Sequence, residues 1–171
     1  GYIVDERPED SNINFRKVLQ WVGQISCTFM RINDFGKLSL QWYNTELLES
    51  DDDIENSKDV VKISEFGTGS SISTNDVVIT GIMVEENGKG ADTTYQCGTD
   101  GYVLKISDNG LIQNGNGGTV SEFIGKKLNG LSFRPMTIKS QSDPSIEPGD
   151  IGLVMDLKGR KHRTIFTAIT Y

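Results

Sequence analysis

The segment PSIEPGDIGLVMDLKGRKHRTIFTAITY, residues 144–171, decides how the end of this chain folds. Apolar residues alternate with polar ones in the two stretches on either side of a short basic turn around Gly159. A period of two predicts β-strands, and a glycine at the reversal permits a tight turn. Pro148 and Gly149 predict another turn just before the first strand. The segment therefore predicts a hairpin that follows a Pro-Gly turn.

Alternation with the same period recurs upstream and predicts further strands. One predicted hairpin has Gly36 in its turn. A second turns at Asn87-Gly88, because Asn and Gly tolerate the positive φ that both turn positions require. A β-branched run between the two hairpins is typical of a short edge strand. The predicted strand segments upstream are residues 27–44, 59–66, 76–86, 93–106 and 131–141.

Two segments show helical spacing instead. The first has Ser11 or Asn14 as its candidate N-cap, and the second has Thr119 or Ser121 near its start and Gly130 at its end. Their apolar positions are Ile13, Val18, Leu19, Val22 and Ile25 in the first, and Val120, Phe123, Ile124 and Leu128 in the second. Two helices among roughly eight to ten strands predict an α+β fold, mostly antiparallel, with a small β-barrel.

The organisation of the chain follows from where these elements lie. With 171 residues, of which 36% are hydrophobic, the chain can bury a real core. Residues 1–11 are expected to be an end segment or linker, and Gly1 in place of Met indicates a piece of a longer protein. Residues 12–75 predict a helix-hairpin peripheral subdomain with an acidic connection. Residues 76–171 predict a β-rich, barrel-like domain that contains the second helix.

The overall charge disfavours two classes of partner. The formal net charge is −7, and no segment is rich in Lys or Arg without acidic neighbours. We therefore expect no tight nucleic-acid binding, since that requires a basic face. No apolar run approaches the roughly 20 residues that span a bilayer, so we expect no membrane insertion.

The residues capable of chemistry do not form a recognisable site. The acidic cluster Asp51, Asp52, Asp53 and Glu55 lacks the EF-hand spacing, with Lys62 in place of the bidentate Glu, and predicts a solvated loop. The single histidine, His162, has cationic neighbours and predicts a surface or strand-edge position. The stretch NGNGGT, residues 114–119, has no phosphate-loop pattern and predicts a flexible connection into the second helix.

The aromatic residues and the cysteines favour structural roles. Trp21, Trp42, Tyr43, Tyr95 and Tyr102 are candidates for stacking on sugars, but the two tryptophans are expected to pack in the core. Cys27 and Cys97 lie far apart without a CxxC arrangement, and two free thiols are favoured over a disulfide. We therefore predict no catalytic residue, no metal site and no cofactor.

The order of these elements resembles a known family. From the first helix through CTFMRINDFGKLSLQWY, ITGIMVEE, TYQCGTDGYVLKISDNGLI and SEFIGKKLNGLSFRPMTI to the closing hairpin, residues 12–171 resemble the tail-tip hub proteins of long-tailed phages and prophages. In Gram-positive hosts these are called tail-associated or prophage endopeptidase-tail proteins. The matching positions in the most specific segment are Pro148, Gly149, Asp150, Gly159, Arg163, Thr164 and Thr170.

The resemblance implies a structural role. Proteins of this family form threefold rings of tube-like barrels with peripheral domains, which join the tail tube to the tip. It implies a homotrimer in the full-length protein, with other tail-tip and tail-tube proteins as partners. It also implies a place in the virion after synthesis in the bacterial cytoplasm. The family's N-terminal barrel and its enzymatic C-terminal extensions are not part of this sequence, so no enzymatic activity is expected here.

Two alternatives remain open from the sequence. The first is a domain that binds or hydrolyses host cell-envelope polysaccharide, with the aromatic residues or the acidic cluster at its site. Paired carboxylates for glycoside hydrolysis depend on a three-dimensional separation that a sequence does not give. The second is a secreted β-rich adhesin, which a disulfide between Cys27 and Cys97 would favour.

Overall fold

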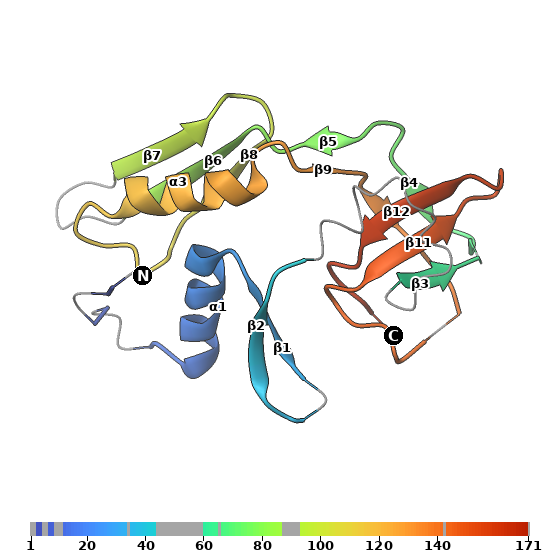
Figure 1. Ribbon diagram of the computed structural model, residues 1–171, viewed down its shortest axis with the longest axis horizontal. Coiled ribbons are helices and arrows are strands. Elements are labelled where there is room, and N and C mark those ends of the chain that lie inside the picture. The colour runs from blue at the N-terminus through green and yellow to red at the C-terminus, as the bar shows by residue number, and fades with distance from the viewer. Residues whose placement is uncertain are drawn as a thin grey trace. The chain divides into compact units, whose positions relative to one another are not determined.

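The computed structural model describes residues 3–4, 7–8, 12–33, 35–43, 60–64, 66–86, 93–141 and 143–170. In these ranges no helix has the length and apolar character needed to cross a membrane. The two helices are α1 (Phe15–Ser26) and α3 (Gly117–Leu128). The strands are β1 (Phe29–Ile32), β2 (Leu38–Gln41), β3 (Val60–Ile63), β4 (Ser71–Ile72), β5 (Val77–Val78), β6 (Gly81–Glu86), β7 (Thr93–Gly98), β8 (Val103–Ile106), β9 (Ser132–Phe133), β10 (Met136–Thr137), β11 (Ile151–Met155) and β12 (Lys161–Ile165). Figure 1 labels most of them.

The predicted α+β class is confirmed. Two helices accompany small sheets of two or three strands, and most strand pairs are antiparallel. Two pairs are parallel, β6 with β8 and β3 with β11. The predicted small barrel is not observed, because the described strands pair in five separate sheets and no sheet closes on itself.

The chain forms two compact units, and each is built from two separate stretches of sequence. Unit 1 comprises Gly1–Gln41 and Val78–Ser132, and unit 2 comprises Trp42–Val77 and Phe133–Tyr171. The helix and hairpin that the sequence grouped into a peripheral subdomain thus belong to the same unit as α3. The chain passes from one unit to the other after β2, within β5 and within β9.

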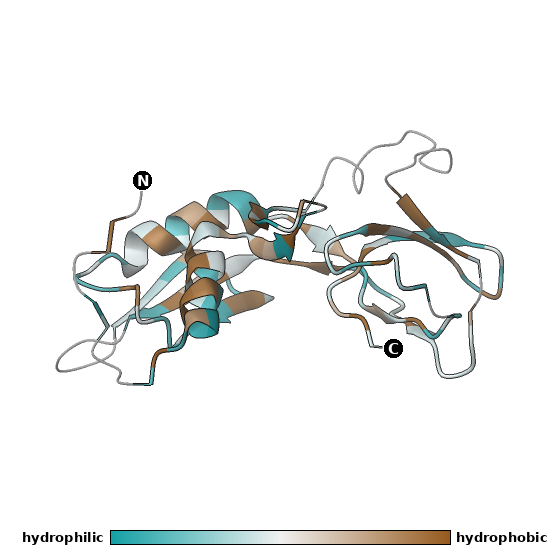
Figure 2. Cartoon of the chain, turned by 90° about the horizontal axis from the view of Figure 1, so that it is seen from below, coloured by the Kyte–Doolittle hydropathy of each residue, from teal (hydrophilic) through white to brown (hydrophobic). Residues whose placement is uncertain are grey.

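Helix α1 begins where the sequence places an N-cap. The Asn14 side chain accepts a hydrogen bond from the Lys17 amide at 2.9 Å, which satisfies one of the free amides of the first turn. Cys27 ends the helix in the left-handed conformation, with φ of 54°. In Figure 2 the ribbon of each helix carries both hydrophobic and hydrophilic residues, as amphipathic helices do.

A buried asparagine ties α1 to a distant loop of unit 1. The Asn109 side-chain amide donates to the Trp21 carbonyl at 3.1 Å and to Gln24 Oε1 at 2.8 Å. Its Oδ1 accepts from the Leu111 amide at 3.0 Å. The Trp21 indole donates in turn to the Asp108 carbonyl at 2.8 Å. These bonds satisfy polar groups that would be costly to bury unpaired, and they fix α1 on this loop.

The sheet of unit 1 has the order β7-β6-β8, and α3 packs on β6 and β7. The centre of this core is formed by Ile82 and Val84 of β6 and Ile124 of α3, all with 1% exposure or less. Gly125 allows the close approach, since a Cβ there would lie 2.6 Å from Cys97 Sγ. The predicted hairpin of β6 and β7 is confirmed as an antiparallel pair, while its Asn87-Gly88 turn lies outside the described residues.

The β1–β2 and β11–β12 hairpins share one turn design. In the first, Asn33 Oδ1 accepts from the amides of Phe35 and Lys37, and the Gly36 amide donates to the Asn33 carbonyl. In the second, Asp156 and Gly159 take the places of Asn33 and Gly36. Both glycines have positive φ, 70° and 75°, as predicted. The sequence pattern common to both turns is Asn or Asp, two residues, Gly and then a basic residue.

Unit 2 is built around the sheet β12-β11-β3. Its core contains Val60 of β3 and Ile151 of β11, with Leu153 and Ile165 packed against them. Residues 151–155 pair antiparallel with 161–165, which confirms the closing hairpin. β3 lies at one edge of this sheet, where the sequence predicted a short edge strand.

Candidate functional site

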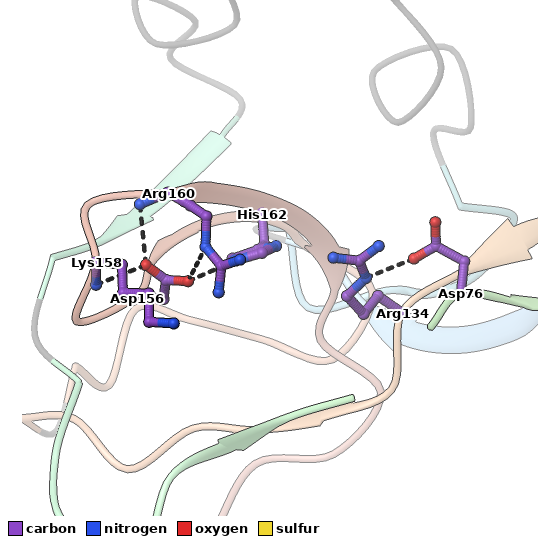
Figure 3. A network of polar contacts seen from close by, with 6 residues as sticks. All are labelled: Asp76, Arg134, Asp156, Lys158, Arg160 and His162. Carbon is purple, nitrogen blue, oxygen red and sulfur yellow. Dashed lines mark hydrogen bonds and ion pairs between the residues drawn. The ribbon is translucent and has the colours of Figure 1, made fainter. Parts of the chain in front are cut away.

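A dense polar cluster of unit 2 lies at the turn between β11 and β12, with the Asp156 carboxylate at its centre (Figure 3). Asp156 Oδ1 accepts from the amides of Lys158 and Arg160 at 2.8 and 2.9 Å. Asp156 Oδ2 accepts from Arg160 Nε at 2.8 Å and lies 3.2 Å from His162 Nε2. We call these four residues the Asp156 cluster.

The electrostatics of the cluster keep its carboxylate ionised. Burial of Asp156 acts to raise its pKa, but hydrogen bonds from the Arg160 amide, His162, the Arg160 side chain and the Lys158 amide outweigh it. The pKa of Asp156 therefore lies well below its ordinary value. A general base needs a pKa near the working pH and a free lone pair toward its substrate. The contacts of the Asp156 cluster thus join its carboxylate to the turn between β11 and β12.

The position of His162 differs in one respect from the sequence prediction. It lies on the edge strand β12, as expected, but its side chain is only 11% exposed and contacts a carboxylate. Sequence reasoning missed this partner because Asp156 lies six residues back, across the turn. A triad would also need a nucleophile beside the imidazole. Among the described residues, the hydrogen bond of His162 goes to Asp156 and to no serine, threonine or cysteine.

The glycine-rich entry to α3 binds an anion, but one from its own chain. Glu86, at the end of β6, is only 6% exposed. Its carboxylate accepts from the Gly115 amide at 2.7 Å and from the Gly117 amide at 3.0 Å. A carboxylate at a helix N-terminus complements the helix dipole. The place that a phosphate would take in a phosphate loop is therefore filled by a side chain.

The start of α3 has a cap that the sequence did not indicate. Thr119 and Ser121 lie near the start of the helix, as expected, but the helix begins at Gly117 with Asn116 in the cap position. Asn116 makes no side-chain cap hydrogen bond. The Ser121 hydroxyl donates to the Gly118 carbonyl within the helix. Glu86 performs the capping role from a strand that precedes the helix by 31 residues.

The remaining polar candidates are the acidic cluster and Lys62. The cluster Asp51, Asp52, Asp53 and Glu55 lies outside the described residues. Within the part of the chain that the structure describes, no three His, Cys, Asp or Glu residues are placed to hold a metal ion. Lys62 is exposed on β3.

The aromatic candidates are dispersed through the chain. Trp21 is buried, as predicted for a packing residue. Trp42 and Tyr43 are half-buried and form a tilted pair with ring centroids 5.0 Å apart. Tyr95 packs against Gly117 at the start of α3, and Tyr102 is exposed. We find no row of exposed aromatic rings on these described residues of the kind that sugar-binding surfaces present.

The two cysteines are free thiols in the structure, as the sequence favoured. Cys27 is buried, and burial raises the pKa of its thiol against the opposing effect of Lys127. Cys97 is half-buried on β7, facing Gly125. The adhesin alternative depended on a bridge between them and gains no support.

Exposed apolar side chains are concentrated on the β1–β2 hairpin. The register pairs Ile32 with Leu38 and Met30 with Leu40, which places these four side chains on one face. Ile32, Leu38 and Leu40 are more than half exposed, and Phe35 in the turn is the most exposed large apolar residue of the described chain. We call Met30, Ile32, Leu38 and Leu40, together with Phe35, the hairpin face. The sequence predicted this hairpin but not that one of its apolar faces would be uncovered.

Comparisons with known proteins add no functional information. No family model matches the chain, and neither curated proteins nor solved structures gave a match. The functional interpretation therefore depends on the residues and geometry above.

Proposed function

We propose that this chain is a non-enzymatic structural module of a phage or prophage tail-tip hub protein, which assembles through protein–protein contacts in a homotrimer. The observation that carries the proposal is the construction of the closing hairpin. Gly149 has a φ of 101°, its amide donates to the Phe166 carbonyl at 2.7 Å, and the Phe166 amide donates to the Asp150 carbonyl at 3.0 Å. Of the positions that resemble the family, Gly149, Asp150 and Gly159 contribute directly to the shape of this hairpin.

The geometry of the candidate sites supports a non-enzymatic role. In the two best-formed carboxylate sites, Glu86 and Asp156, both oxygens accept hydrogen bonds from donors of the same chain. Both carboxylates stabilise local structure, at the start of a helix and at a hairpin turn. A catalytic carboxylate would instead face a space that a substrate could enter.

The proposed barrel would require strands from more than one copy. In unit 2, β3 and β12 are the edge strands of the described sheet. An edge strand presents backbone groups that can pair with a strand of another chain. We propose that neighbouring copies add strands at these edges and so close the ring. The net charge of −7 fits a conduit for DNA, since an acidic lining repels phosphates.

The experiment that tests this proposal combines an assembly assay with a binding assay. The chain would be incubated with purified cell-wall polysaccharide and peptidoglycan, and released fragments and bound protein would be measured. We expect neither release nor saturable binding, together with concentration-dependent self-association. Saturable glycan binding or muropeptide release by a monomer would contradict the proposal and favour the envelope-binding alternative.

A further inference from the structure

Asn-Gly steps are concentrated at the entry to α3. The chain has five of them, and two follow each other directly in Asn114-Gly115-Asn116-Gly117. The others are Asn87-Gly88, Asn109-Gly110 and Asn129-Gly130. An asparagine followed by glycine is chemically labile, because glycine has no Cβ to hinder attack of its backbone nitrogen on the asparagine side chain. The fold therefore either leaves each step open to reaction or holds it closed.

The reaction at such a step is spontaneous deamidation. The glycine amide nitrogen loses its proton and bonds to the asparagine Cγ, the bond from Cγ to the side-chain nitrogen breaks, and ammonia leaves with that proton. Water then opens the resulting succinimide ring, at one carbonyl to give aspartate and at the other to give isoaspartate. Because the N–H bond must break, a glycine amide that donates a hydrogen bond reacts only after local opening. Such a hydrogen bond therefore protects the step.

Glu86 holds both glycine amides at the entry to α3. Its Oε1 accepts from the Gly115 amide at 2.7 Å, and its Oε2 accepts from the Gly117 amide at 3.0 Å. Glu86 is only 6% exposed, so water competes poorly for the two amides. The negative charge of the carboxylate also opposes removal of a proton from either amide. Asn114 itself is exposed, so the hydrogen bond rather than burial protects its step.

The other described Asn-Gly steps are held by different groups. The Gly130 amide donates to the Ile79 carbonyl at 2.8 Å. Asn109 is 1% exposed, and its side-chain amide is hydrogen-bonded to α1. Asn87-Gly88 lies outside the described residues. Among the steps that the structure describes, those that depend on a carboxylate are therefore the two before α3.

We propose that Asn114-Gly115-Asn116-Gly117 is a latent deamidation site and that the Glu86 carboxylate keeps it closed. The inference does not depend on the proposed function. The two hydrogen bonds that satisfy the helix amides also suppress the attack of those amides on the preceding asparagines. Either product adds a negative charge beside the glycines that Glu86 binds, and isoaspartate lengthens the backbone there. Once it has reacted, the site no longer accommodates Glu86 in the same way.

The test compares Glu86→Gln with Glu85→Gln and follows each asparagine separately. Glu85 is the neighbour on β6 and contacts Lys105 instead, so the control removes a carboxylate without touching the two amides. The parent and both variants would be kept in neutral buffer, folded and in concentrated urea. Mass spectrometry of proteolytic peptides, with fragmentation to assign each site, measures deamidation over time. Circular dichroism establishes that the variants are folded.

We expect Asn114 and Asn116 of the folded parent to deamidate at least about tenfold more slowly than in urea, because a hydrogen bond to a charged group shifts an opening equilibrium by roughly 10- to 100-fold. In folded Glu86→Gln at least one of the two steps should accelerate about tenfold, since the Gln amide leaves one glycine amide without an acceptor. Asn129 should accelerate much less, because the Ile79 carbonyl still holds Gly130. Glu85→Gln should deamidate as the parent does.

The step at Asn129 separates local protection from a general loss of stability. Global unfolding would expose all of these steps, so equal acceleration at Asn114, Asn116 and Asn129 would overturn the role of Glu86. Equal rates at Asn116 in the folded and the unfolded parent would overturn the inference even if Glu86→Gln does not fold. Either result leaves the proposed function to its own association and glycan-binding assays.

Discussion

Replacing the buried carboxylate of Glu86 tests how unit 1 is held together. The side-chain amide of the Glu86→Gln variant would keep one carbonyl oxygen for a helix amide but turn an NH₂ group toward the other. Hydrogen bonds to charged groups contribute about 1.5–3 kcal/mol. The interaction of the charge with the helix N-terminus adds about 0.3–1 kcal/mol. We therefore expect the free energy of unfolding of unit 1 to fall by about 2–4 kcal/mol.

The adjacent residue provides the control. Glu85 points to the other side of β6 and forms an ion pair with Lys105, whose side chain is 57% exposed. Exposed ion pairs contribute about 0.2–1 kcal/mol, so Glu85→Gln should have little effect. Urea unfolding would be followed by the fluorescence of buried Trp21 in a Trp42→Phe background. Equal midpoints for the two Gln variants would refute the capping role of Glu86.

Three further predictions concern other parts of the molecule. Hydrogen bonds in the folded chain favour ionised Asp156 and lower its pKa, so the unfolded state binds a proton more readily and acid favours unfolding. The difference in free energy of unfolding between the parent and Asp156→Asn should therefore be full at pH 7 and decrease below a pH of about 4. Urea midpoints measured over this pH range test the prediction. Gly125→Ala would bring a methyl group within 2.6 Å of Cys97 Sγ and should lower the free energy of unfolding of unit 1 by about 1–3 kcal/mol. Gly115→Ala is the control for backbone strain, because Gly115 has a φ of 80° and open space where its Cβ would lie. Cys27 should react with a thiol reagent more slowly than Cys97 in the native chain, and equal rates would contradict its burial.

Features governed by local chemistry were predictable from the sequence. The cap at Asn14, the reversals at Gly36 and Gly159 and the closing hairpin each depend on residues close together in the chain. Positive φ at a glycine and a side-chain acceptor before a helix leave a direct mark in the sequence.

Features governed by distant contacts were not predictable. The cap of α3 comes from Glu86, and unit 1 is joined by Asn109 and Trp21, which lie 88 residues apart. The parallel pairing of β3 with β11 likewise links strands from distant parts of the sequence. Period-two alternation predicts that a segment is a strand but does not specify its partner. For this reason the number of strands could not establish whether they close into a barrel, and the predicted barrel is not observed among the described strands.

In the candidate site, too, local features could be predicted from the sequence and distant contacts could not. The absence of a metal-ligand or triad spacing could be recognised from the sequence. The contact of His162 with Asp156 has no comparable signal, because the two residues lie six positions apart on either side of the turn. The uncovered hairpin face has no sequence signal, because exposure depends on what the rest of the chain covers.

The most direct test of the central claim, that the module assembles into a trimeric hub, is the solution mass of the natural protein that contains these residues. Light scattering over a range of concentrations measures that mass. We predict three copies per particle, stable on dilution. A mass of one copy at every concentration would contradict the account.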